Sequence, residues 1–194
     1  MNYDVPATAA HNQILGEGCY FRPQAFYQDF PASLTAADIA NTSQLWIYNP
    51  PAAPNGANYL IVPSGTSFAA SPSPSLTLTA PVSTSSANWD DALSPPITLP
   101  FTFPFPGGST SDITIGSNGC IYLASVVDST YAVCGAAYGS IAGFRDLAPR
   151  LAPFYVDLDP SAAGTIHYDV AAGNGSVTIT WDSVPEWPAG PNTN

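Results

Sequence analysis

The stretch from Ile97 to Trp187 determines the fold class of this chain. It reads LPFTFPFPGGST at residues 99–110, ITIGSNGCIYL at 113–123 and SVTITWDSVPEW at 176–187. Apolar and polar side chains alternate in it, and Gly, Pro, Asn and Asp separate the alternating runs. A period of two with turn residues between the runs predicts half-buried strands, and therefore an all-β fold. The alternation is clearest at Asp112–Ile115, Thr165–Tyr168 and Ser176–Trp181.

A Pro- and Phe-rich run, Ile97–Pro106, predicts an edge strand or a bulged strand. Its prolines have no N–H to donate to a neighbouring strand, which confines them to edges and bulges. Gly107-Gly108 then turns the chain. Farther along, Ser117-Asn118-Gly119 predicts a tight turn, because Asn and Gly tolerate positive φ. We therefore expect an antiparallel, β-sandwich-like module.

The N-terminal region is predicted to be irregular and rich in aromatic residues. Residues 1–16 show no clear periodicity and are expected to form an arm. Cys19–Phe30 is densely aromatic, and the spacing of its last three aromatic residues predicts a short helical turn, with a second one at Ser33–Ala40. Packing of these aromatics against the core is favoured over an exposed platform for sugars.

Two more strands are predicted before the main module. They are Gln44–Tyr48 and Tyr59–Val62, which flank a loop rich in Pro and Gly. A soft boundary near Ser94–Pro96 separates an N-terminal region, residues 1–95, from the main β module, residues 96–194. Because both regions contain strands, they can belong to one sandwich.

The charge balance excludes two classes of partner. The chain has 194 residues, of which 45% are hydrophobic and 9% charged, and its net charge is −11 with three arginines and no lysine. Nucleic-acid binding depends largely on Lys and Arg, and an anionic membrane surface would repel this chain. No apolar run approaches the roughly 20 residues of a spanning helix. We therefore expect neither nucleic acid nor membrane as a partner.

The first residues, Met1–Pro6, lack the basic and apolar regions of a signal peptide. The chain is then either cytoplasmic or a mature secreted protein without its leader. The absence of lysine, the many Ser, Thr, Pro and Gly residues and the β character favour a secreted or cell-surface protein.

The three cysteines support the same compartment. Cys120 and Cys134 each follow a strand-like run, and a hairpin would bring them together as a disulfide. A bridge that closes a loop of about 15 residues stabilises the fold by roughly 3 kcal/mol. Cys19 is left over, and it either pairs outside this chain or is a buried thiol. No Cys/His spacing indicates zinc.

Several motifs, taken together, resemble one known family. The first are the Pro-Phe-rich strand that ends in Gly-Gly and the turn Ser117-Asn118-Gly119. The next are an APFYVDLD run, a Gly followed by a strand, and two Trp-containing runs, at Ala152–Asp159, Gly164–Tyr168, Val177–Trp181 and Val184–Trp187. They resemble the nidogen-type extracellular (NIDO) module found in secreted bacterial exoproteins. The resemblance covers roughly residues 96–187, about half of the chain.

The resemblance implies an extracellular β-sandwich-like module of the kind used in adhesion and matrix proteins, and it implies no activity. The family pattern would continue with further strands beyond Trp187, whereas this chain ends at Asn194. The module is therefore expected to be truncated at its C-terminal end. An open sheet edge accepts a strand from another chain. Self-assembly into a homo-oligomer, or pairing with another extracellular protein, is the hypothesis that follows.

Catalytic groups are scarce in this sequence. No Gly-x-Ser-x-Gly elbow occurs, and the two imidazoles, His11 and His167, are expected in the arm and in a strand. Asp157 and Asp159, two apart on a strand, would lie about 7 Å apart on one face. That spacing is compatible with acid–base catalysis of glycoside hydrolysis. The sequence nevertheless favours a non-enzymatic protein, with a hydrolase of unrecognised type as an alternative.

The same carboxylates suggest a cation site. Calcium prefers several carboxylate and carbonyl oxygens, and Asp157, Asp159 and Asp169 are its candidate ligands, with Asp90 and Asp91 as a second cluster. The competing interpretation is that these side chains cap turns or pair with a nearby arginine. Calcium is the single cofactor that the sequence suggests.

The sequence therefore predicts a non-enzymatic structural or adhesion module. The first alternative is a module that binds carbohydrate or another polymer through exposed aromatic rings, since such rings suit pyranose stacking. Its candidate rings are Trp46, Trp89, Trp181 and Trp187. Burial of these rings in the core is the competing interpretation.

Overall fold

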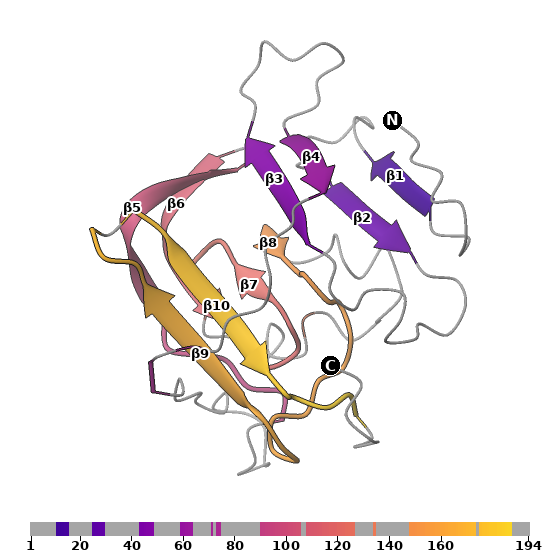
Figure 1. Ribbon diagram of the computed structural model, residues 1–194, viewed down its shortest axis with the longest axis vertical. Coiled ribbons are helices and arrows are strands. Elements are labelled where there is room, and N and C mark those ends of the chain that lie inside the picture. The colour runs from indigo at the N-terminus through magenta and orange to yellow at the C-terminus, as the bar shows by residue number, and fades with distance from the viewer. Residues whose placement is uncertain are drawn as a thin grey trace. The chain divides into compact units, whose positions relative to one another are not determined.

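The computed structural model describes eleven separate parts of the chain, and each regular element in them is a β-strand, labelled β1 to β10 (Figure 1). The all-β fold class is confirmed. Within these parts there is no helix that is long and apolar enough to cross a membrane. The described residues are 11–15, 25–29, 43–48, 59–63, 71, 73–74, 90–105, 108–126, 134, 148–173 and 175–187.

The chain divides into two compact units. The first comprises Met1–Ala69 together with Pro104–Ser109, and the second comprises Ala70–Phe103 together with Thr110–Asn194. Residues from Ala70 onward thus belong mainly to the second unit. The division into 1–95 and 96–194 expected from the sequence stays a prediction.

The first unit contains two antiparallel strand pairs. β1 (His11–Leu15) pairs with β2 (Ala25–Asp29), and β3 (Gln44–Tyr48) pairs with β4 (Tyr59–Pro63). The two strands predicted at 44–48 and 59–62 are confirmed.

Two sequence expectations for the first unit are wrong. The helical turn expected at Phe26 and Tyr27 is a strand, and His11–Leu15, expected within an irregular arm, is the strand that pairs with it. The reason is that each segment satisfies its backbone N–H and C=O groups through the other, a pairing that local spacing cannot reveal. Phe30 and the turn expected at Ser33–Ala40 lie outside the described residues.

The main sheet of the chain has four strands in the order β5-β6-β7-β8. They are β5 (Ile97–Phe105), β6 (Gly108–Ile115), β7 (Ile121–Tyr122) and β8 (Arg150–Leu151). β5 is an edge strand, as its prolines predict, and its exposed residues alternate with less exposed ones along its whole length. The pairings of β6 with β7 and of β7 with β8 are antiparallel.

A separate two-stranded hairpin follows in the second unit. β9 (Thr165–Val170) pairs antiparallel with β10 (Val177–Asp182), which confirms both predicted strands (Figure 1). The register places Ile166 opposite Trp181 and His167 opposite Thr180. Because side chains alternate between the two faces, one face is apolar and the other carries Thr, His and Asp side chains.

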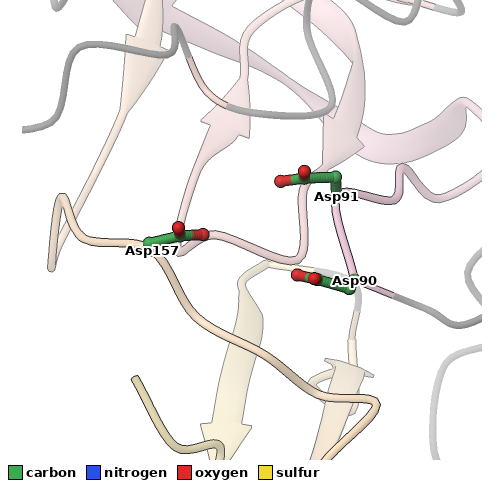
Figure 2. A group of neighbouring side chains, drawn as sticks. All are labelled: Asp90, Asp91 and Asp157. Carbon is green, nitrogen blue, oxygen red and sulfur yellow. The ribbon is translucent and has the colours of Figure 1, made fainter. Parts of the chain in front are cut away.

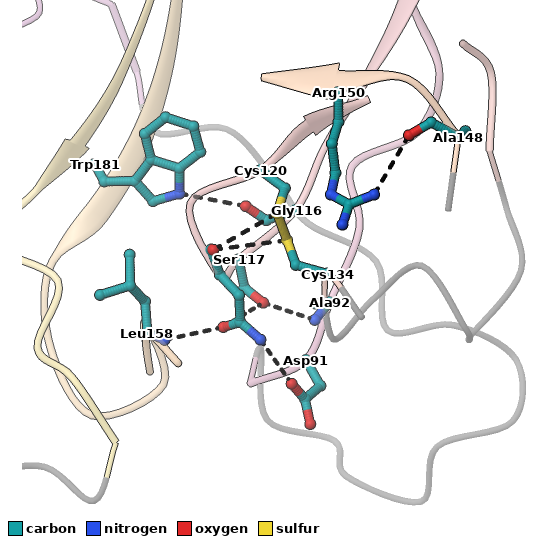
Figure 3. The surroundings of a disulfide bond; sticks show 11 residues. Asp91, Ala92, Gly116, Ser117, Cys120, Cys134, Ala148, Arg150, Leu158 and Trp181 are labelled. Carbon is teal, nitrogen blue, oxygen red and sulfur yellow. Dashed lines mark hydrogen bonds between the residues drawn. A yellow bond between two sulfur atoms is a disulfide. The ribbon is translucent and has the colours of Figure 1, made fainter. Parts of the chain in front are cut away.

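The buried core beside the main sheet is built around a disulfide. Cys120 and Cys134 are bridged, as predicted, with their Cα atoms 6.2 Å apart, and both are fully buried (Figure 3). Leu93, Tyr122 and Val126 complete the cluster. The packed apolar side chains and the disulfide therefore stabilise the same region of the fold.

Candidate metal site and the turn that supports it

The turn Ser117-Asn118-Gly119 follows β6 and connects it to β7. The Gly116 N–H donates to the Cys120 carbonyl oxygen at 2.8 Å, and Gly119 has a φ of 73°. The turn predicted from these residue types is therefore confirmed. The Asn118 carbonyl oxygen lies 3.8 Å from Cys120 Sγ and 3.6 Å from Cys134 Sγ, so the turn contacts the disulfide directly (Figure 3).

The Asn118 side chain joins two loops that are distant in sequence. It is fully buried, its Nδ2 donates to Asp91 Oδ1 at 2.8 Å, and its Oδ1 accepts from the Leu158 N–H at 3.1 Å (Figure 3). A buried amide that uses both its donor and its acceptor in this way fixes the positions of its partners. Asn118 thus holds the Asp91 loop and the Leu158 loop together.

The segment that carries Asp91 is also fixed by two serines. The Ala92 N–H donates to Ser117 Oγ at 3.0 Å, and the Ser117 N–H donates back to the Ala92 carbonyl at 2.9 Å. Ser94 Oγ accepts from the Ile115 N–H at 2.9 Å, and the Ser94 N–H donates to the Ile115 carbonyl at 2.7 Å. Backbone and hydroxyl groups therefore position the residues that follow Asp91.

Three carboxylates meet at the loops that Asn118 joins. Asp90, Asp91 and Asp157 each offer one oxygen, and these oxygens all lie within 4.8 Å of one another (Figure 2). Each of the three residues is half-buried. We call Asp90, Asp91 and Asp157 the acidic cluster. Three carboxylates this close repel one another unless a proton or a cation neutralises part of the charge.

Asp90 lies in an environment that disfavours its charged form. Burial, followed by the charge of Asp91, raises the pKa of the Asp90 carboxyl from 3.8 to about 6, and Asp159 and Asp157 add to the rise. Its Oδ1 atom is buried and has no hydrogen-bond partner among the described residues. Asp90 is therefore a carboxyl at which a proton or a cation would relieve a desolvation and repulsion penalty.

The raised pKa of Asp90 predicts that stability falls as the pH rises. The folded protein binds this proton more tightly than the unfolded chain, so the stabilising contribution is complete below pH 4 and is lost through pH 6. The pKa change corresponds to at most about 3 kcal/mol, which solvent screening at a half-buried site reduces to about 1 kcal/mol. In calcium-free buffer, chemical unfolding at pH 5.0 and 7.5 should show this loss, and Asp90→Asn should remove it. An unchanged pH dependence in Asp90→Asn would contradict the assignment.

The three carboxylates that the sequence suggests as calcium ligands lie in three separate places. Asp157 belongs to the acidic cluster together with Asp90 and Asp91, which the sequence suggested as a separate group. Asp159 Oδ1 accepts from the N–H groups of Ser161 at 2.9 Å and Ala162 at 3.2 Å, and also from the Ser161 hydroxyl. That arrangement is the capping of a turn. Asp169 lies on β9, where it accepts a hydrogen bond from the Ser71 hydroxyl.

Asp157 does not lie in a β-strand. The backbone around it pairs with the segment that ends at Trp187 over a few residues. The Trp187 N–H donates to the Asp157 carbonyl and the Asp159 N–H donates to the Pro185 carbonyl, both at 2.8 Å. Leu158 forms an isolated antiparallel bridge with Glu186 between them. No spacing in the sequence connects this segment to Asp90 and Asp91, and the hydrogen bonds of Asn118 join the two loops.

The tryptophans expected to bind ligands have different surroundings. Trp187 is 54% exposed, whereas the Trp181 indole N–H donates to the Gly116 carbonyl at 3.3 Å, which fixes that ring against the turn (Figure 3). The backbone of Trp46 lies in β3, and its side chain is outside the described residues, as is Trp89. Trp187 is thus the one candidate ring that the described residues show as exposed.

A family relationship covers most of the chain. A model of the family described as NIDO related matches residues 59–193. The chain belongs to the NIDO-related family. The match extends farther toward the N-terminus than the resemblance at residues 96–187, and it contains the acidic cluster, the disulfide and the Ser117-Asn118-Gly119 turn. Searches of curated proteins and of solved structures found no significant match.

Membership of the NIDO-related family indicates a general class of function. The family fits an extracellular module of structural type and is not a known enzyme family. The buried disulfide agrees with an oxidising compartment, because such bonds persist mainly outside the cytosol.

Proposed function

We propose that this NIDO-related chain is a secreted, non-enzymatic structural or adhesion module that self-assembles through the free edge of β10. The observation that carries the proposal is the hairpin of β9 and β10, a sheet of only two six-residue strands without proline. A strand at the edge of a sheet presents unpaired N–H and C=O groups, which accept a strand from another chain.

The register identifies the backbone groups that face this edge. The Ala171 N–H donates to the Ser176 carbonyl at 3.0 Å, so hydrogen-bonded pairs recur at every second position from there. Val177 and Ile179 lie at the intervening positions, and their N–H and C=O groups therefore point away from β9. Among the described residues, the backbones of Val177 and Ile179 form no hydrogen bond with a third strand.

The edges of the main sheet are less suited to strand addition. β5 carries Pro100 and Pro104, which have no N–H, and β8 has only two residues. Short strands and edge prolines are the means by which proteins block unwanted pairing. The β10 edge has neither protection, which supports its choice as the contact between copies.

Molar mass measured by light scattering over a concentration series tests this proposal. The mass of the wild-type chain should increase with concentration, while Ile179→Pro should remain monomeric, because it removes an outward N–H and no bond to β9. Ile179→Val is the matched control, since it keeps the N–H and should assemble like the wild type. A wild-type chain that stays monomeric at every concentration would contradict the proposal.

We also propose that the acidic cluster binds calcium. The buried, unpartnered Oδ1 of Asp90 is the observation that favours it, since a hard cation would satisfy this oxygen and reduce the repulsion among three carboxylates. Calcium takes six to eight oxygens, so backbone carbonyls and water would complete the set. The ion would connect the Asp90–Asp91 turn to the Asp157 loop.

Calcium is therefore expected to raise the melting temperature, and a chelator should reverse the increase. Asp157→Asn should abolish the response, because it removes the ligand from one of the two loops. Asp182→Asn is the matched control, as this carboxylate accepts a hydrogen bond from Ser183 and is not in the acidic cluster. An equal response in Asp157→Asn, or none in the wild type at millimolar calcium, would refute the site.

Carbohydrate binding is the second candidate, and the exposed ring of Trp187 favours it. The Trp187 N–H donates to the Asp157 carbonyl oxygen, so the backbone that carries the ring is fixed to that loop. A glycan-array screen should then show binding that is lost in Trp187→Ala. Binding that persists in this variant would exclude Trp187 as the stacking platform.

A further inference from the structure

Ser71, Ser73 and Pro74 are the described residues of a short segment, residues 71–74, which we call the strap, and its two serines bond to the polar side of β9. The Ser71 hydroxyl donates to Asp169 Oδ2, and His167 Nδ1 donates to the Ser73 carbonyl oxygen at 2.9 Å. A carbonyl oxygen only accepts, so Nδ1 carries the proton in this contact. The partners are 98 and 94 positions apart in the sequence, so the contacts are tertiary.

The two bonded residues of the strap have the same spacing in the sequence as their two partners on β9. His167 and Asp169 are two residues apart on β9 and therefore share one face of the hairpin. Ser71 and Ser73 are also two residues apart, and they pair with the strand in the opposite order. Two side chains of β9 thus bond two serines of the strap that are two residues apart.

The strap cannot join β9 through a regular ladder of backbone bonds. Pro72 and Pro74 have no N–H, and the Ser73 N–H donates to Ser71 Oγ at 3.2 Å within the strap itself. Attachment depends instead on the side chains of Asp169 and His167. Hydrogen bonds from Ser71 and then Ser73 hold the pKa of Asp169 below its ordinary value, which agrees with a carboxylate that receives them.

His167 is oriented by a second contact on the same face. Its Nε2 lies 2.8 Å from Thr165 Oγ1, and this leaves Nδ1 directed at the strap. The face that holds the strap therefore consists of Thr165, His167 and Asp169, at every second position of β9. Such a face exists whether the segment bound to it belongs to the same chain or to another.

The strap begins close to a boundary between the two compact units. The N-terminal segment of the first unit, Met1–Ala69, ends two residues before Ser71. Contacts limited to a few side chains can open locally while the rest of the fold stays intact. An element attached in this manner beside a connection can be exchanged between identical chains. The strap has no charged residue, so its exchange brings no further negative charge to Asp169.

We propose that the Thr165–Asp169 face of β9 is an exchangeable docking site for a short Ser-Pro segment. The chain's own strap fills it in the monomer, and the strap of a second copy fills it in the assembly. The inference rests on the proposed function because it requires that copies associate. It adds a contact that is separate from the β10 edge, and the two can be tested apart.

Complementary variants test the exchange in an Ile179→Pro background, where the β10 edge is blocked. Ser71→Asp places a carboxylate against Asp169, which releases the strap and leaves the face of β9 intact. Asp169→Ala removes the acceptor and leaves the strap intact. Each variant alone should be monomeric, whereas their equimolar mixture should approach twice that mass in light scattering, because one intact strap and one intact face meet in trans.

The control mixture replaces Asp169→Ala by Asp182→Ala. Asp182 lies on the same face of the hairpin, opposite Thr165, and bonds Ser183 and not the strap, so this mixture should stay monomeric. Ser71→Ala repeats the test with a milder change, and circular dichroism establishes that each variant is folded. A complementary mixture that remains monomeric, or a control mixture that dimerises equally, overturns the exchange. Wild-type assembly by the β10 edge alone would then leave the proposed function standing without it.

Discussion

Replacement of Cys120 and Cys134 together by alanine is expected to lower the free energy of unfolding by about 3 kcal/mol. The bridge spans 14 positions, and its loss restores the conformational freedom of that loop in the unfolded chain. For a protein of this size the melting temperature should fall by about 6–12 °C. Thermal melting followed by circular dichroism measures the change.

The burial of the bridge predicts a second property of the same bond. Both cysteines are 0% exposed, so a reductant reaches the sulfur atoms only when the surrounding core opens. Reduction of the native protein should therefore be slow and should accelerate in denaturant. A double alanine variant that melts within a degree of the wild type would show that packing of Leu93, Tyr122 and Val126 suffices without the covalent link.

Gly119→Ala is expected to be about as damaging, at about 3 kcal/mol. Gly119 has a φ of 73°, where an L side chain costs about 1–2 kcal/mol. A Cβ atom there would also overlap the carbonyl oxygen of Phe154, which is backbone and cannot rotate away. Forced overlap in a packed site adds a further 1–3 kcal/mol, on the order of other overpacking substitutions. Denaturant unfolding of the purified variant measures the loss.

Two other glycines separate the contributions at Gly119. Gly173 has a φ of 90° and no atom within 4 Å of a built Cβ, so Gly173→Ala should show only the backbone strain. Gly175 has open space and no positive φ, so Gly175→Ala should be close to neutral. Equal losses in Gly119→Ala and Gly173→Ala would mean that the contact with Phe154 contributes nothing.

The turn also connects stability to the candidate metal site. Asn118 holds Asp91 by one amide atom and the Leu158 loop by the other, so displacement of the turn separates the residues of the acidic cluster. Gly119→Ala should therefore weaken any calcium response as well as stability. The disulfide contacts the same turn at the Asn118 carbonyl, which places both large predictions in one structural region.

The strands that could be predicted from the sequence share one pattern of residues. β5, β9 and β10 alternate apolar and polar residues, and the alternation follows from a pleated backbone that buries one side. The sequence does not predict β2, because three closely spaced aromatic residues are compatible with a helical turn as well as with a strand. Its pairing with β1 decided between the two, and pairing is a property of two segments.

The sequence by itself determined the all-β class, the edge position of β5, the tight turn at Ser117-Asn118-Gly119 and the pairing of Cys120 with Cys134. These properties depend on backbone preferences and on residues close in the chain, which composition and spacing record directly. Only the tertiary structure decided that Asp157 joins Asp90 and Asp91, and that Asp169 holds the strap instead. Such groupings depend on the hydrogen bonds of Asn118 and on the packing of distant loops, and no periodicity along the chain encodes them.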